Sequence, residues 1–187
     1  IYGPNSKPIR AASASLDAYV HQLIDAFQAS NKHTQFVIVG DHGMLPVSDS
    51  IDAYSLIHEA ARRNDLKENR DYLIFLDSTL VRIWCPAERT RITMLDCLEG
   101  PPFSEKGEII TERNAKCLAV PPPGDRYGHL IWRANPGTMV FPDYFNSELP
   151  KGMHGYPTHH ENQKGMALLY GNGIVPRIEQ EAELIDL

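Results

Sequence analysis

The amphipathic stretch near the start of the chain is its clearest pattern of hydrophobic and polar positions. Four apolar residues recur at spacings of four, three and four, and so form one stripe along a helix; they are Leu16, Val20, Leu23 and Phe27. This pattern predicts a helix over residues 11–29, with Asn31 as the residue that stops it. The unbroken apolar run Phe36–Val39 then predicts a strand that is buried on both faces of a parallel sheet. A helix followed by a buried strand is typical of an α/β fold.

The next part of the chain predicts another helix and then a hairpin. Residues 50–63 have apolar positions at helical spacing. The apolar runs at residues 72–76 and 80–85 flank the turn sequence Asp77-Ser78-Thr79, which predicts a β-hairpin. Pro86 is expected at the first position of a third helix that runs to Leu98.

The second half of the chain contains shorter runs. Residues 108–120 and 129–141 carry strand-like runs, separated by the proline-rich loop at residues 121–125. Residues 166–170 predict a final apolar strand. The change from long elements to hairpins suggests an inserted subdomain in the middle of the chain.

Composition narrows the class of protein. The chain has 187 residues, 42% hydrophobic and 22% charged, which fits one globular domain. A net charge of −6 and the lack of a basic run argue against binding to a nucleic-acid polymer. No apolar stretch approaches the ~18 residues that span a bilayer, so no membrane span is expected in this chain. Three cysteines without a CxxC pair argue against a disulfide framework, although one bridge plus a free thiol stays open.

The segment Gly40-Asp41-His42-Gly43-Met44 places a carboxylate and an imidazole directly after the Phe36–Val39 run. In open α/β sheets, ligands bind beyond the carboxyl ends of the strands. Carboxylate oxygen and imidazole nitrogen suit zinc or a similar divalent ion. The alternative is a helix-capping aspartate beside a hydrogen-bonded loop histidine.

A second cluster, Gly152-Met153-His154-Gly155-Tyr156, lies far downstream. His154 is a candidate metal ligand, and its alternative is an ordinary surface-loop histidine. His159 and His160 follow as solvated loop residues that could also shape a pocket rim. Tyr156 and His159 are candidates for contact with a substrate.

Together these clusters resemble the alkaline-phosphatase superfamily, and in particular the nucleotide pyrophosphatase/phosphodiesterase (type I phosphodiesterase) family. The landmarks that carry the resemblance follow the family's order along the chain. They are Gly3-Pro4-Asn5-Ser6 (GP-x-S), Phe36–Met44 (a strand and SDHGM), Arg126–Ile131 with Pro136-Gly137 (R-x-G-D, a strand and a PG turn), Met153–Tyr156 (HGY) and Met166–Gly171 (the last core strand).

The resemblance implies an α/β fold with an alkaline-phosphatase-like core sheet, flanking helices and a small inserted α+β cap subdomain. The change in sequence pattern places this subdomain at roughly residues 65–135, which leaves residues 1–64 and 136–187 for the core. The family's Asp-x-x-Gly-His motif would end immediately before Ile1, so we expect a C-terminal portion that lacks the N-terminal part of the same protein.

The resemblance also implies two divalent metal ions, zinc in the family. Asp41 and His42 would bind the zinc that activates the nucleophile, and His154 would bind the other. The Thr or Ser nucleophile would lie upstream of Ile1, so we expect no catalytic nucleophile in this chain and little activity from the chain alone. The implied reaction is hydrolysis of a small-molecule phosphodiester, nucleotide or pyrophosphate, and the implied compartment is periplasmic, secreted or otherwise extracytoplasmic.

Three residues depart from the family pattern. Gly40 stands where Ser is usual, His129 where Asp or Glu is common, and Pro157 where Asn or Asp is frequent. The alternatives are a related phosphomonoesterase, phosphonate hydrolase or sulfatase, or an inactive fragment that serves as a binding module.

Overall fold

The structure is a computed structural model that describes residues 2–118, 120–178 and 182. The chain divides into two compact units. One, the mixed-sheet unit, contains residues 1–4 and 44–163, and the other, the helix–ribbon unit, contains residues 5–43 and 164–187.

Helix α1 (Lys7–Ser30) is the long element of the helix–ribbon unit. It begins four residues before the predicted helix because Ser6 caps it and Pro8 occupies its first turn. The Ser6 hydroxyl accepts a hydrogen bond from the Ile9 amide at 3.4 Å. The predicted end is confirmed, since the amide of the capping residue Asn31 donates to the Phe27 carbonyl.

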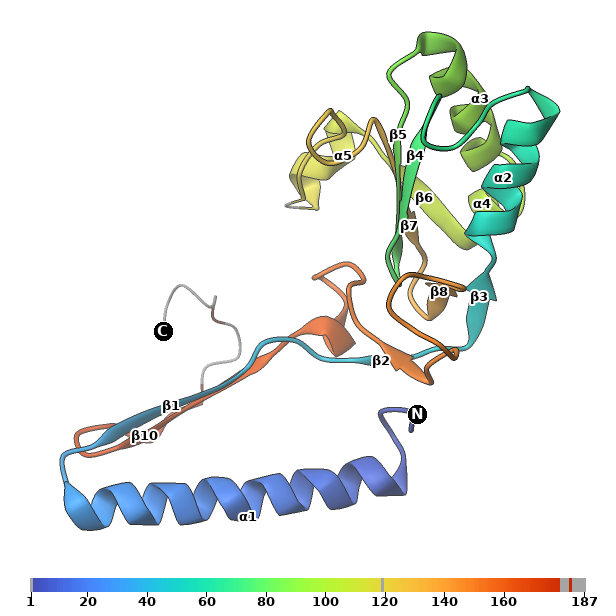
Figure 1. Cartoon of the computed structure of the whole chain (residues 1–187). Helices are drawn as coiled ribbons and strands as arrows, with labels where there is room; N and C mark the ends of the chain where they lie inside the picture. The colour runs from blue at the N-terminus through green and yellow to red at the C-terminus, as the bar shows by residue number, and fades with distance from the viewer. Residues whose placement is uncertain (1, 119, 179–181, 183–187) are drawn as a thin grey trace. The chain divides into compact units, whose positions relative to one another are not determined.

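Strand β1 (Gln35–Gly40) pairs with β10 (Met166–Gly171) in an antiparallel ribbon, and α1 runs alongside it (Figure 1). The prediction of a strand buried on both faces of a parallel sheet was therefore wrong. Val37 and Val39 are 55% and 43% exposed, whereas Phe36 packs edge-to-face on Phe27 of α1. An apolar run alone does not distinguish parallel from antiparallel pairing, which depends on the partner strand.

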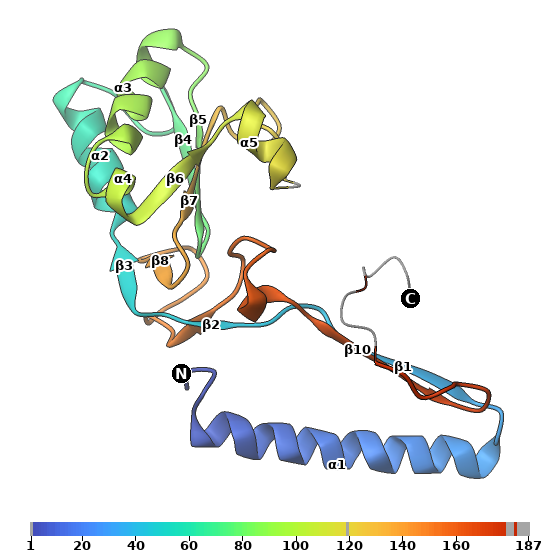
Figure 2. The same ribbon diagram turned by 180° about the vertical axis from the view of Figure 1, so that it is seen from behind.

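The mixed-sheet unit is built on a four-stranded antiparallel sheet. Its strands, in sheet order, are β4 (Leu73–Leu76), β5 (Leu80–Trp84), β7 (Leu130–Ala134) and β6 (Gly107–Ile110). Its helices are α2 (Ala53–Arg63), α3 (Glu88–Glu99), α4 (Phe103–Lys106) and α5 (Glu112–Cys117). Helices α2, α3 and α4 lie on one side of the sheet and α5 on the other (Figures 1 and 2). The predicted β4–β5 hairpin is confirmed.

Successive side chains of β7 point to opposite faces of the sheet, and each face contributes to its own hydrophobic cluster. Trp132 belongs to the main core with the helices, and Ile131 to a small cluster with Ala115 of α5. The main core also contains Ile57 and Ala61 of α2. Helix α2 is therefore packed in the same core as the four-stranded sheet. The division into a core of residues 1–64 and 136–187 and a cap of residues 65–135 stays a prediction.

Two short pairs of strands complete the mixed-sheet unit. Strand β2 (Leu45–Pro46) pairs antiparallel with β9 (Gly152–Met153). Strand β3 (Asp49–Ile51) pairs parallel with β8 (Thr138–Val140).

One local prediction was wrong and one was incomplete. Helix α3 begins at Glu88 with Ala87 as its cap, so Pro86 precedes the helix instead of opening it. The short strand-like runs predicted in residues 108–120 correspond to β6, but the prediction missed α5, which starts directly after β6 at the capping box of Thr111 and Asn114.

Cys85, Cys97 and Cys117 are free thiols, as the absence of paired motifs predicted. Among the helices in the described part of the chain, none has both the length and the apolar character needed to cross a membrane.

Gly107 offers a direct test of the sheet packing. A methyl group at this position would overlap the Trp132 ring and the Arg133 carbonyl oxygen, so backbone would have to move. We expect Gly107→Ala to lower the free energy of unfolding by about 2 kcal/mol, measured by urea denaturation. Gly124→Ala is the matched control, because a methyl group there meets no atom within 4 Å. Equal losses of stability in the two variants would contradict the packing described here.

Candidate functional site

Asp41 and His42 lie where the β1–β10 ladder ends, at the Gly40–Met166 pair. The backbones of Gly165 and Gly40 lie very close together at this point: a methyl group on Gly165 would overlap the Gly40 carbonyl oxygen. Only glycine permits this approach of the two backbones. The Asp41 side chain is 83% exposed and that of His42 is 37% exposed.

The two side chains adopt a geometry that fits a shared cation. The His42 amide donates to Asp41 Oδ1 at 3.0 Å, and His42 Nδ1 lies 2.9 Å from the Gly43 carbonyl oxygen. A carbonyl can only accept, so in the neutral ring Nδ1 carries the proton and Nε2 carries the lone pair. Metal-binding histidines typically have their second nitrogen held in this way.

The distance between the two donor atoms supports the same conclusion. Asp41 Oδ2 lies 3.5 Å from His42 Nε2. Two ligands that each bind a tetrahedral zinc ion at about 2.1 Å stand roughly 3.4 Å apart. One oxygen and one nitrogen are therefore spaced as two ligands of one ion would be.

His154 lies in an exposed loop of the mixed-sheet unit, directly after β9. The next residue, Gly155, has a φ of +90°, a conformation that side-chain-bearing residues rarely adopt. Its carbonyl accepts a hydrogen bond from the Thr79 hydroxyl at 3.1 Å. The backbone on which His154 sits is thus held from the β4–β5 turn.

Tyr156 anchors the other side of this loop. It is only 4% exposed, its amide donates to Gln163 Oε1 at 3.1 Å, and its hydroxyl donates to the Thr138 carbonyl at 2.9 Å. These contacts give Tyr156 a role in packing the loop. His159, the other residue considered for substrate contact, is exposed.

Sequence patterns did not reveal Thr79, Thr138 or Gln163 as supports of this loop. Thr79 is buried and bonds to a residue 76 positions away. The turn composition around Thr79 indicates a hairpin, but the partner of its hydroxyl depends on tertiary packing.

The metal-ligand candidates are divided between the two units. Asp41 and His42 belong to the helix–ribbon unit and His154 to the mixed-sheet unit, and their convergence on one site stays a prediction. Within residues 2–118, 120–178 and 182, no three His, Cys, Asp or Glu side chains are grouped so that they could hold a metal ion.

A cavity of about 680 Å³ lies between α2 and the loop that follows it. Its lining includes Tyr54, His58, Glu59, Asp65, Glu68 and Tyr72. The lining also contains the basic residues Arg62 and Lys67, so acidic and basic groups are mixed around this cavity. His154, the candidate ligand in the same unit, does not line this cavity.

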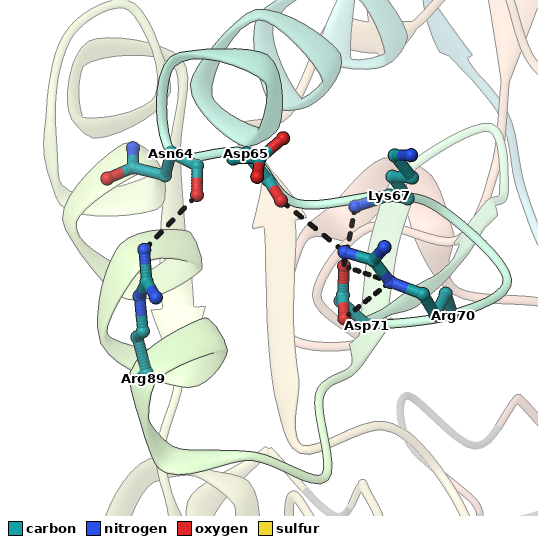
Figure 3. Close-up of polar contacts among 6 residues, drawn as sticks. All are labelled: Asn64, Asp65, Lys67, Arg70, Asp71 and Arg89. Atoms are coloured by element: carbon teal, nitrogen blue, oxygen red, sulfur yellow. Dashed lines mark hydrogen bonds and ion pairs between the residues drawn. The ribbon is translucent and has the colours of Figure 1, made fainter.

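The loop beside this cavity is fixed by its own polar contacts (Figure 3). Arg70 Nη2 donates to Asp71 Oδ2 at 2.6 Å, and the same carboxylate oxygen accepts from the Lys67 amide at 2.8 Å. Arg89 Nη2 donates to the Asn64 carbonyl at 3.4 Å, which ties the end of α2 to α3. These contacts fix the local conformation of the loop.

Comparison with known families gives a match over most of the chain. The family described as type I phosphodiesterase / nucleotide pyrophosphatase matches residues 1–157. No curated protein matches the chain.

Solved structures of two kinds of enzyme share the fold of this chain: ectonucleotide pyrophosphatase/phosphodiesterase 5 and a phosphonoacetate hydrolase. Human ectonucleotide pyrophosphatase/phosphodiesterase 5 is 18% identical with a TM-score of 0.70, and the match covers 91% of this chain and 43% of that one. An inactive variant of the murine protein in complex with AMP is 15% identical with a TM-score of 0.69, covering 90% and 42%. Phosphonoacetate hydrolase from Sinorhizobium meliloti, in complex with phosphonoacetate, is 14% identical with a TM-score of 0.62, covering 95% and 44%.

These matches establish an α/β fold of the ectonucleotide pyrophosphatase/phosphodiesterase and phosphonoacetate hydrolase type. The chain spans less than half the length of each of these solved structures.

Two buried tyrosines make the packing of the mixed-sheet unit measurable: Tyr156 in the His154 loop and Tyr72 beside the cavity next to α2. Burial raises the pKa of Tyr156 from 10.0 to about 12, and burial together with the charge of Glu68 raises that of Tyr72 to about 12. The unfolded chain ionises near pH 10, so the stability that these neutral phenols contribute is complete below pH 10 and is lost as the pH rises toward 12. We expect a late step near pH 12 in a tyrosinate absorbance titration.

Tyr156→Phe should remove part of that late step and make the fall in unfolding free energy between pH 10 and 12 less steep. Tyr19→Phe is the control, because Tyr19 is exposed on α1. A Tyr156→Phe titration curve that keeps the full late step would contradict the burial of this side chain.

Proposed function

We propose that this chain, which belongs to the type I phosphodiesterase / nucleotide pyrophosphatase family, forms part of a metal-dependent hydrolase of phosphodiester or pyrophosphate bonds. The observation that carries the proposal is the pair of donor atoms after β1, with Asp41 Oδ2 and His42 Nε2 3.5 Å apart. Because the solved relatives are more than twice as long as this chain, the activity is proposed for the whole protein.

The proposed metal ligands in this chain are Asp41, His42 and His154. Asp41 and His42 would hold one zinc ion and His154 a second. Two such cations, when bound, would offset the charge of the phosphate and of the leaving oxygen and lower the pKa of the nucleophile.

The chain's own residues would orient those ligands. The Gly43 carbonyl holds the proton on His42 Nδ1, which leaves the lone pair on Nε2, while Asp41 Oδ1 accepts the His42 amide. With one oxygen used in this way, Asp41 Oδ2 remains the oxygen turned toward His42 Nε2. Phosphoryl transfer depends mainly on such positioning and on charge stabilisation.

The nucleophile is proposed to be a Thr or Ser outside these 187 residues. On this proposal, the chain alone hydrolyses phosphodiesters poorly or not at all, while the whole protein turns them over. A nucleotide or another small phosphodiester is the proposed substrate, supported by the AMP bound to a murine structure with the same fold.

A second candidate reaction is phosphonate hydrolysis. The support for it is the shared fold with the phosphonoacetate hydrolase, at a TM-score of 0.62. A panel containing a chromogenic phosphodiester, a phosphomonoester, a sulfate ester and phosphonoacetate separates these chemistries on the whole protein.

His154→Ala in the whole protein provides the decisive comparison. We expect loss of a zinc ligand to lower kcat/KM on the preferred substrate by at least about 100-fold. His159→Ala is the matched control in the same loop and should change kcat/KM only a few-fold. Chelation should abolish turnover, and added zinc should restore it.

Three results would contradict this proposal. Equal losses at His154 and His159 would show that the ligand assignment in this loop is wrong. Turnover by the chain alone at the rate of the whole protein would place a nucleophile within these residues. Inactivity of the whole protein on every substrate would favour a binding module.

A further inference from the structure

Thr79 connects the β4–β5 turn to the loop that carries His154. It is 4% exposed, and its hydroxyl donates to the Gly155 carbonyl at 3.1 Å. A buried threonine hydroxyl that bonds to a backbone carbonyl satisfies a polar group that would otherwise be desolvated without compensation.

Gly155 and Thr79 fit each other closely. A methyl group on Gly155 would lie 2.9 Å from Thr79 Oγ1, and the φ of +90° at Gly155 also disfavours a side chain. The turn can therefore approach the loop only because residue 155 is glycine. This approach, together with the Thr79 hydrogen bond, holds the Gly155–Tyr156 peptide, one residue after His154.

The turn that presents Thr79 is itself held by distant segments. The Thr79 carbonyl accepts from the Ala134 amide at 2.9 Å, and the Ser78 carbonyl accepts from the Val140 amide at 2.9 Å. The Ser78 hydroxyl donates to Asp143 Oδ2 at 2.9 Å. With its backbone held in this way, Thr79 presents its hydroxyl from a fixed point to the loop.

We propose that Thr79 is a positioning residue for His154. Its hydroxyl holds the carbonyl of the Gly155–Tyr156 peptide, and through the backbone of Gly155 it sets where the preceding residue, His154, presents its imidazole. The proposal rests on the metal-binding role proposed for His154. It assigns Thr79 no contact with metal or substrate.

The test compares Thr79→Val, Thr79→Ser and Thr90→Val in the whole protein. Valine keeps the shape of threonine and removes the hydroxyl, whereas serine keeps the hydroxyl. Thr90→Val is the matched control, because Thr90 is equally buried but lies in α3.

The first measurement is hydrogen exchange in the metal-free protein. The reporter is the Tyr156 amide, which donates to Gln163 Oε1 within the same loop. We expect Thr79→Val to speed its exchange about 10-fold, and Thr79→Ser and Thr90→Val to leave it close to wild type.

The second measurement is zinc affinity by competition with a chelating dye, followed by kcat and KM. We expect Thr79→Val to weaken zinc binding about 10-fold and to lower kcat more than it changes KM, with rescue in Thr79→Ser. Loss of the Thr79 hydroxyl would change the position of the metal ligand His154 and leave the groups that bind the substrate in place.

The outcomes separate this proposal from the proposed function. Unchanged exchange in Thr79→Val would overturn the positioning role directly. Faster exchange with unchanged zinc affinity would overturn the link to His154 while leaving the metal site intact. A wild-type protein that binds no zinc would overturn the proposed function, and the exchange data would still report whether Thr79 holds the loop.

Discussion

The turn between β4 and β5 is the point on which the mixed-sheet unit depends, because its polar groups are satisfied by segments far away in the sequence. The Ser78 and Thr79 carbonyls accept amides from Val140 and Ala134, and their hydroxyls reach Asp143 and Gly155. Both residues are buried, so leaving any of these groups without a partner would cost about 1–3 kcal/mol. One three-residue turn thus joins the antiparallel sheet, β8 and the His154 loop.

A different constraint shapes the helix–ribbon unit. Its ribbon has only two strands, and α1 packs against the side of β1 that carries Phe36. An isolated two-stranded ribbon is only marginally stable in water. Here the two strands pair in a continuous antiparallel register from Gln35–Gly171 to Gly40–Met166. The ladder ends at the Gly40–Met166 pair, beside the close approach of Gly165 to Gly40, and the candidate pair Asp41 and His42 follows directly.

Local patterns predicted those features that local physics decides. The apolar stripe of α1, the β4–β5 hairpin and the position of Asp41 and His42 after a strand could all be inferred from spacing and turn chemistry. The direction of the β1–β10 pairing could not, because an apolar run suits either direction. Helix α5 was missed, although the sequence contains a local signal for its start, the Thr111–Asn114 capping box. The apolar residues on both sides of that box favour a strand instead. The role of Thr79 could not be predicted from the sequence, because its hydrogen-bond partner lies 76 residues away and is set by tertiary packing.

The candidate ligands and their supports differ in exposure, and this difference has a physical reason. Asp41 and His154 are exposed, whereas Thr79, Thr138, Tyr156 and Gln163 are buried. A cation site needs lone pairs that solvent or substrate can reach, while a support acts only if burial makes its hydrogen bonds costly to lose. Substitution of a ligand should therefore remove chemistry and spare the fold, and substitution of a support should alter both. Mutational effects on stability and on metal affinity, measured separately, distinguish the two kinds of residue in this chain.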